Sequence, residues 1–153
     1  PSVGAVVQSY LHRTEDDCRA LATEGSRVRL VKGAYDEPPE VAYQEREEVS
    51  ASFRRGLDVL LAGPGYPMIG THDPALLEYA VARAAELGRE PGDHEYQLLY
   101  GVRPAEQRRL AAEGHTVRVY VPYGQQWYPY LMRRLAERPA NLSFFLRALV
   151  SRS

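Results

Sequence analysis

The sequence has little that would hold a disulfide, a metal or a membrane. Cys18 is the only cysteine, which excludes an internal disulfide and a CxxC zinc or redox motif. No apolar run approaches the roughly 18 residues of a membrane-spanning helix. Nineteen Lys and Arg residues against twenty Asp and Glu residues give a formal net charge of -1, so no bulk field attracts nucleic acid or anionic lipid. This composition fits the reducing cytoplasm, and any recognition must be local.

The histidines and tyrosines do not form a recognised binding pattern. His12, His72, His94 and His115 are dispersed, without HxH or HxxxH spacing, so we expect no metal site. We expect His12, His94 and His115 to be surface residues. The eleven tyrosines lack an accompanying basic patch, which argues against base stacking and nucleic acid binding.

Short apolar segments rich in β-forming residues alternate with helical segments along the chain. Strands are predicted at 4–11, 27–31, 66–70, 95–99 and 116–121. Helices are predicted from 14 to a stop at 25, and over 39–61, 74–88, 104–114 and 126–149. The segment 14–17 resembles a capping box, while Asp73 and Pro74 suit an N-cap and the first helical position.

Five apolar strands separated by helices predict an α/β fold with a parallel sheet, either a TIM barrel or a doubly wound sheet. No GxGxxG follows the first strand, which weakens the doubly wound, dinucleotide-binding interpretation. Polar residues gather toward the carboxyl ends of the strands, where a TIM barrel has its active site. They are Gln8, Arg29, Lys32, Thr71, His72, Gln97 and Tyr120. A closed barrel needs eight βα units and about 250 residues, so five units in 153 residues predict a partial (βα)8 TIM barrel.

Six strings in register connect the chain to a known family. They are Gln8-Ser-Tyr-Leu11, Arg29-Leu-Val-Lys-Gly-Ala-Tyr35, Gly70-Thr-His-Asp73, Glu95-Tyr-Gln-Leu-Leu-Tyr-Gly101, Arg118-Val-Tyr-Val-Pro-Tyr-Gly124 and Tyr128-Pro-Tyr-Leu-Met-Arg-Arg-Leu-Ala-Glu-Arg-Pro-Ala-Asn141. Their order and approximate spacing resemble those of the proline dehydrogenase family. The resemblance extends over nearly the whole chain.

The resemblance implies a distorted (βα)8 barrel that binds FAD and oxidises L-proline to 1-pyrroline-5-carboxylate, the first step of proline catabolism. Electrons would pass to a membrane quinone, so the enzyme would be cytoplasmic and peripheral at the inner face of the membrane. Residues 1–153 would form the C-terminal part of the barrel domain, about the last five βα units with a C-terminal helical region. The family's earlier strands supply a lysine and an aspartate to the substrate pocket, so we expect a missing N-terminal half and an isolated chain without activity.

By resemblance, Arg29 donates to the N5 edge of the flavin, where a positive donor would stabilise the charge of the reduced ring. Gln8 suits the flavin pyrimidine edge, because an amide donates and accepts together. The resemblance implies a cofactor set of Gln8, Arg29, Val31, Lys32, Gly33, Ala34, Thr71, His72 and Gln97. From the residues alone, a structural ion pair for Arg29, an exposed charge for Lys32 and a hydrogen bond inside the barrel for Gln8 remain open.

By resemblance, Arg133 and Arg134 bind the proline carboxylate, with Glu137 as an orienting partner. Paired guanidinium groups suit a carboxylate because they make bidentate, charge-assisted hydrogen bonds. A solvated salt bridge among the same three residues is the alternative. Tyr120 and Tyr130 are either core aromatics or, as the resemblance implies, pack against the substrate ring.

The hypothesis for the reaction is hydride transfer from the proline carbon beside nitrogen to flavin N5, with Arg29 and Tyr120 as the catalytic candidates. No residue of the chain stands out as a general base. Two alternatives remain: a different TIM-barrel enzyme, such as a metal-dependent hydrolase or lyase, and a noncatalytic binding fragment.

Overall fold

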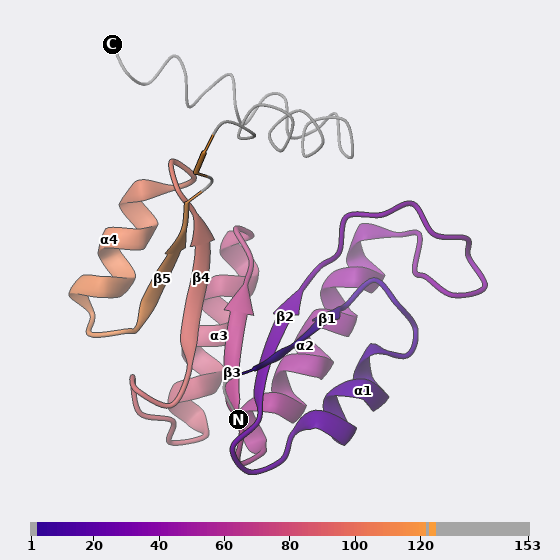
Figure 1. Cartoon of the computed structure of the whole chain (residues 1–153), viewed down its shortest axis with the longest axis horizontal. Helices are drawn as coiled ribbons and strands as arrows, with labels where there is room; N and C mark the ends of the chain where they lie inside the picture. The colour runs from indigo at the N-terminus through magenta and orange to yellow at the C-terminus, as the bar shows by residue number, and fades with distance from the viewer. Residues whose placement is uncertain (1–2, 122, 125–153) are drawn as a thin grey trace.

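The computed structural model describes residues 3–121 and 123–124, in which five strands alternate with four helices (Figure 1). The strands are β1 (Ala5–Gln8), β2 (Arg27–Val31), β3 (Tyr66–Gly70), β4 (Glu95–Leu99) and β5 (Val117–Tyr120). The helices are α1 (Thr14–Leu21), α2 (Arg46–Ala62), α3 (Pro74–Glu86) and α4 (Pro104–Ala112). A membrane-spanning helix is absent from this described part of the chain.

The strands form one sheet in the order β1-β2-β3-β4-β5, and every neighbouring pair is parallel. This confirms the predicted parallel α/β fold. The predicted limits of β2, β3 and β4 are those observed, while β1 and β5 are shorter than predicted. Each pair of successive strands is joined through one helix, as parallel strands require.

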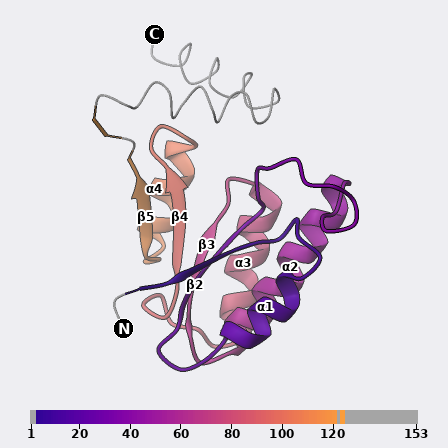
Figure 2. The ribbon, with the colours of Figure 1, turned by 45° about the vertical axis from the view of Figure 1, so that its right-hand side comes forward.

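The core lies between the sheet and the helices. On β2, Val28 and Leu30 are buried, and Ile69 of β3 and Leu98 of β4 lie with them in one apolar cluster. All four helices contribute to this same cluster, which includes Cys18, Phe53, Leu57, Leu77 and Leu110. Figure 2 shows α1, α2 and α3 packed side by side along the sheet. Because side chains alternate along a strand, the other residues of each strand point to the opposite face, which no described helix covers.

The end of α2 and the start of α3 depend on specific polar contacts. The Asp73 side chain accepts a hydrogen bond from the Ala75 N–H, and Pro74 takes the first helical position, as predicted. The Arg89 guanidinium donates to carbonyl groups of Leu60, Leu61, Gly63 and Gly65. It therefore caps the carboxyl end of α2, whose last carbonyls have no partner within the helix.

The predicted capping box at Thr14 is wrong. Arg13 is the N-cap of α1, without a side-chain capping bond, and the Thr14 hydroxyl instead donates to the Gln8 carbonyl at 2.5 Å. The helix also ends at Leu21, before the predicted stop at Gly25. The hydroxyl thus ties the start of α1 to the end of β1.

The predicted start of the second helix is also wrong, because residues 39–45 are not helical. The His12 N–H donates to the Val41 carbonyl, and the Tyr43 N–H donates to the Tyr10 carbonyl. Leu11 and Ala42 form an isolated antiparallel bridge. Pairing with the segment after β1 therefore uses the backbone groups that a helix would need, and α2 begins only at Arg46.

The prediction that His94 is a surface residue is wrong, since its exposed fraction is 1%. Its ring packs edge-on against Tyr96, and the Nε2 and the Tyr96 hydroxyl are 3.3 Å apart. His12 is exposed as predicted, whereas His115 is partly buried beside the same two rings. The predicted helical region 126–149 lies outside the described residues.

Candidate active site

The sheet face opposite the helices, called the polar face below, carries the predicted site residues Gln8, Arg29, Gln97 and Tyr120. On β4, Tyr96 and Leu98 point into the core, so Glu95, Gln97 and Leu99 point the other way. The same alternation on the other strands brings polar side chains together on this face. They are Gln8, Arg27, Arg29, Tyr66, Glu95, Gln97, Arg118 and Tyr120.

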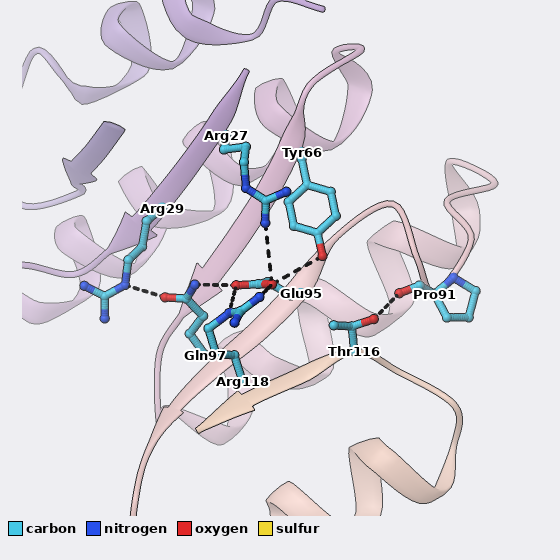
Figure 3. A network of polar contacts seen from close by, with 8 residues as sticks. All are labelled: Arg27, Arg29, Tyr66, Pro91, Glu95, Gln97, Thr116 and Arg118. Atoms are coloured by element: carbon cyan, nitrogen blue, oxygen red, sulfur yellow. Dashed lines mark hydrogen bonds and ion pairs between the residues drawn. The ribbon is translucent and has the colours of Figure 1, made fainter. Parts of the chain in front are cut away.

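Glu95 is the centre of a charged network on the polar face (Figure 3). Its side chain is fully buried, and Arg118 donates to both carboxylate oxygens at 2.7 and 2.8 Å. Tyr66 donates to Oε2 at 3.3 Å, and an Arg27 Nη lies 3.8 Å from the same oxygen. The hydrogen bonds from Arg118 outweigh burial and lower the pKa of Glu95, so the carboxylate is ionised at neutral pH.

Arg29 reaches across β3 to Gln97, where its Nε donates to Oε1 at 2.6 Å. Gly70 of β3 pairs in register with Gln97, and a Cβ added at Gly70 would lie 3.4 Å from the Arg29 Nε and 2.8 Å from a Val31 methyl. A glycine at this position therefore leaves room for the guanidinium to cross the strand. Within the described residues, neither Nη of Arg29 has a partner, and each Nη carries two N–H bonds that can donate to a ligand.

Lys32, directly after β2, lies on the helix side rather than on the polar face. Its Nζ donates to Asp73 Oδ2 at 2.7 Å and to the Ser50 hydroxyl at 3.0 Å. Burial opposes ionisation of Asp73, but Lys32 and the N–H groups of Ala75 and Leu76 outweigh it and lower the pKa of Asp73. Lys32 is therefore paired, an arrangement that the sequence did not indicate.

The loop that follows Lys32 needs glycine at position 33. Gly33 has φ of +98°, and a Cβ built on it would lie 2.1 Å from a ring carbon of Tyr10. The Tyr10 ring thus packs directly on the loop backbone. Ala34 and Val31, the other small predicted contacts here, are partly buried.

Thr71 and His72 close the carboxyl end of β3 against β4. The Thr71 hydroxyl accepts a hydrogen bond from the Asp73 N–H at 3.2 Å. His72 Nε2 accepts one from the Leu99 N–H at 2.9 Å, just beyond the last paired residues of the two strands. Burial, then the charges of Arg103 and Arg29, lower the pKa of His72 to about 4. The ring is therefore neutral at pH 7, with its proton on Nδ1, which can donate to a ligand.

Two further predicted residues lie on the polar face at the carboxyl ends of strands. Gln8 ends β1 and is partly buried, and Tyr120 ends β5 with an exposed fraction of 57%. The remaining predicted substrate contacts lie outside the described residues. They are Tyr130, Arg133, Arg134 and Glu137.

Sequence reasoning missed the charged network that is centred on Glu95. Its other members are Arg27, Tyr66 and Arg118. A signal was present, because charged residues occupy alternate positions in otherwise apolar strands, as in Arg27-Val-Arg29. Such alternation indicates that one face of the strand carries charge. The pattern does not say which charges meet, because that depends on strand register.

A cavity of about 380 Å³ lies at the other, amino end of β2 and β3, lined by Ser26, Arg27, Gly65, Tyr66, Arg89 and Asp93 among others. The charged groups there already have protein partners. Arg89 binds carbonyl groups, and Asp93 accepts from the Glu90 N–H. In the described part of the chain, no group of three His, Cys, Asp or Glu side chains could hold a metal ion. We therefore place the candidate site on the polar face.

A parallel sheet with the four described helices on one face, and with arginine and amide groups on the other, defines a βα-repeat protein with a polar sheet face. The sequence model of the family described as Proline dehydrogenase matches residues 1–147. This chain therefore belongs to the proline dehydrogenase family.

The relatives agree with this assignment. The chain is 39% identical to Proline dehydrogenase 1 of Bacillus subtilis over 150 residues, which are 98% of this chain and 50% of that protein. It is 40% identical to Proline dehydrogenase of Deinococcus radiodurans over 148 residues, which are 97% of this chain and 48% of that protein. The chain thus spans about half the length of these relatives.

Solved structures show the same fold. Proline utilization A (PutA) from Bdellovibrio bacteriovorus, inactivated by N-propargylglycine, superposes with a TM-score of 0.79 at 27% identity, covering 86% of this chain and 16% of that one. A mutant PutA of Bradyrhizobium japonicum superposes with a TM-score of 0.70 at 27% identity, covering 97% of this chain and 17% of that one.

Proposed function

We propose that the full-length protein is an FAD-dependent proline dehydrogenase that oxidises L-proline to 1-pyrroline-5-carboxylate and passes the electrons to a quinone. The observation that supports this proposal is the hydrogen bonding of the Arg29 guanidinium. Its guanidinium is held on the polar face by Gln97, and its two Nη groups have no partner within the described residues. A fixed positive donor is what an electron-accepting ring needs beside it.

The donors on and beside the polar face fit FAD. Arg29 offers two Nη groups, His72 offers Nδ1–H, and the end of β1 presents the Gln8 amide. FAD carries carbonyl oxygens and ring nitrogens along its pyrimidine edge and an anionic pyrophosphate, so it needs such donors. Gly70 adds no side chain beside Arg29, so the guanidinium can cross β3 to the place where it would meet the flavin. When bound, the flavin supplies the two-electron acceptor, which no amino acid side chain provides.

We propose that Val31, Lys32, Gly33, Ala34, Thr71 and Gln97 complete the cofactor contacts. Lys32 and Thr71 would act there mainly by holding Asp73 and the loop in place, because both already have partners around the start of α3. Gln97 would act through the Arg29 contact.

For the substrate, we propose that Arg133 and Arg134 bind the proline carboxylate, with Glu137 orienting them. Tyr120 and Tyr130 would limit the position of the pyrrolidine ring. The support within the described residues is the place of Tyr120, which is exposed on the polar face at the carboxyl end of β5. A tyrosine there can cover a ligand without losing core packing.

We also propose that the described strands are about the last five of a (βα)8 barrel. The strand order is consecutive and the helices lie on one face, which is how a barrel is wound. β1 and β5 each pair with only one described strand, so each has an edge on which further strands could add. The match to about half of each relative agrees with this division. We place the full-length protein in the cytoplasm, peripheral at the inner face of the membrane where a quinone would receive the electrons.

The test uses the full-length protein that contains this chain. We expect a yellow protein with a flavin absorbance spectrum and proline-dependent reduction of a soluble quinone analogue. A yellow protein without turnover would support a noncatalytic binding protein instead. A colourless protein with a metal-dependent activity would support a different enzyme of the βα class.

Expressed alone, residues 1–153 should neither retain FAD nor oxidise proline. The edges of β1 and β5 present unpaired N–H and C=O groups, which favour association between chains. Size-exclusion chromatography with flavin absorbance measures both effects. A monodisperse, yellow and active chain would contradict the half-barrel assignment.

A further inference from the structure

The side-chain amide of Gln97 is held between two groups of opposite hydrogen-bonding character. Its Nε2 donates to Glu95 Oε1 at 2.5 Å, and its Oε1 accepts from Arg29 Nε at 2.6 Å (Figure 3). An ionised carboxylate can only accept and a guanidinium can only donate. The amide therefore has one orientation, with its oxygen toward Arg29.

The Glu95 carboxylate, which accepts from the Gln97 amide, is itself held by several other contacts. It is fully buried, and Arg118 holds both of its oxygens in a bidentate contact. Tyr66 donates to Oε2, and the Arg27 guanidinium lies 4.0 Å over the Tyr66 ring. The carboxylate is thus held by contacts that involve neither Arg29 nor Gln97.

We propose that Glu95 is a positioning residue that orients Arg29 through Gln97. The guanidinium is planar, so a contact at Nε fixes the plane of the group and with it the directions of both Nη groups. This inference rests on the proposed function, in which those groups face the flavin. Glu95 itself would touch neither flavin nor proline.

The first test is the midpoint potential of the bound flavin in the full-length protein. Glu95→Gln keeps the shape of the side chain but can donate as well as accept, so the Gln97 amide is no longer held in one orientation. Loss of one negative charge alone would raise the potential, since it favours the reduced, more negative flavin. Loss of the Arg29 contact would lower it.

A double-mutant cycle with Arg29→Met separates the two effects. We compare the change in midpoint potential that Glu95→Gln causes in the parent with the change it causes in the Arg29→Met protein. In the Arg29→Met protein only the charge effect remains, so we expect the change in the parent to be the more negative of the two. Equal shifts in both proteins would overturn the proposal. Asp58→Asn is the matched control, because Asp58 pairs with Arg83 and Tyr79 on the helix side and should show no coupling to Arg29.

Gln97→Met is a second variant for the case in which Glu95→Gln does not fold, because it leaves Glu95 with its arginines. It should shift the potential to more negative values, and this shift should be absent from the Arg29→Met protein. A shift of the same size in the parent and in the Arg29→Met protein would overturn the proposal that Glu95 orients Arg29 through Gln97.

A crystal structure of the full-length Glu95→Gln protein gives a result that does not depend on flavin. We expect the contact between Arg29 Nε and Gln97 Oε1 to be lost or the amide to be reversed. An unchanged contact would overturn the proposal even if FAD binds and proline is oxidised. Conversely, a parent protein without FAD would contradict the proposed function, while this structure would still decide the role of Glu95.

Discussion

Lys32 and Asp73 form an ion pair of 2.7 Å that joins the end of β2 to the start of α3. Asp73 is also the N-cap of α3, with its other oxygen accepting the Ala75 N–H at 3.1 Å. Both side chains are partly buried, at 24% and 32% exposure, so solvent screens the pair in part. One carboxylate therefore joins a loop of the candidate site to a core helix.

The two functions of Asp73 can be separated by substitution. Asp73→Asn keeps the cap but removes the ion pair, and should lower the free energy of unfolding by less than about 1 kcal/mol. Asp73→Ala removes both and should cost about 1 to 2 kcal/mol more than Asp73→Asn. Urea unfolding of the full-length protein measures the difference. Equal losses for the two variants would show that the cap contributes little.

Arg133→Met or Arg134→Met in the full-length enzyme should raise the KM for proline by at least about tenfold. Losing a charge-assisted contact to the carboxylate costs about 1.5 to 3 kcal/mol. Flavin content should hardly change, because these residues are assigned to the substrate. Steady-state kinetics and the visible flavin spectrum measure the two quantities.

Arg108→Met is the matched control for the two arginine variants, since Arg108 is an exposed residue of α4. It should leave the KM for proline unchanged. If Arg133→Met and Arg134→Met behave like this control, a solvated salt bridge explains both arginines.

Tyr120→Ser should improve the relative use of hydroxyproline. Removing the ring makes room for one added hydroxyl, and a group of this size in a pocket is worth about 1 to 3 kcal/mol of discrimination. Tyr120→Phe keeps the ring and should discriminate as the parent does. The ratio of kcat/KM for the two substrates is the measurement. If Tyr120→Ser shows the parental ratio, Tyr120 does not limit the ring position.

His72 should make the full-length protein less stable in mild acid. Its pKa falls from 6.5 to about 4 on folding, so the unfolded chain binds the proton more tightly than the folded protein. The free energy of unfolding therefore decreases as pH falls from about 6.5 to about 4, by at most about 3 kcal/mol from this residue. His94, whose pKa is also lowered by burial, adds in the same direction.

His72→Gln tests this assignment, because its amide oxygen can accept the Leu99 N–H without titrating. Denaturant unfolding at several pH values should show a smaller loss in acid for this variant than for the parent. An equal loss would mean that other groups cause the acid sensitivity.

Several elements could be predicted from the sequence because their causes are local. The limits of β2, β3 and β4 follow from short apolar runs bounded by turn residues. The start of α3 follows from Asp73 and Pro74, whose capping geometry involves only neighbouring residues. Alternating strands and helices were also enough to predict the parallel sheet. The roles assigned to Arg133, Arg134 and the other residues beyond 124 stay predictions.

The tertiary structure alone decided which distant groups meet. The composition of residues 39–45 predicts a helix, but backbone hydrogen bonds to residues 10–12 prevent a helix from forming there. The sequence predicts that His94 is a surface residue, yet it is buried and its ring packs against Tyr96. Arg29, Gln97 and Glu95 come together only because strand register and Gly70 allow one side chain to cross β3. Local sequence determines propensity and caps, whereas these contacts join residues far apart in the chain, so their free energy appears only when the sheet has formed.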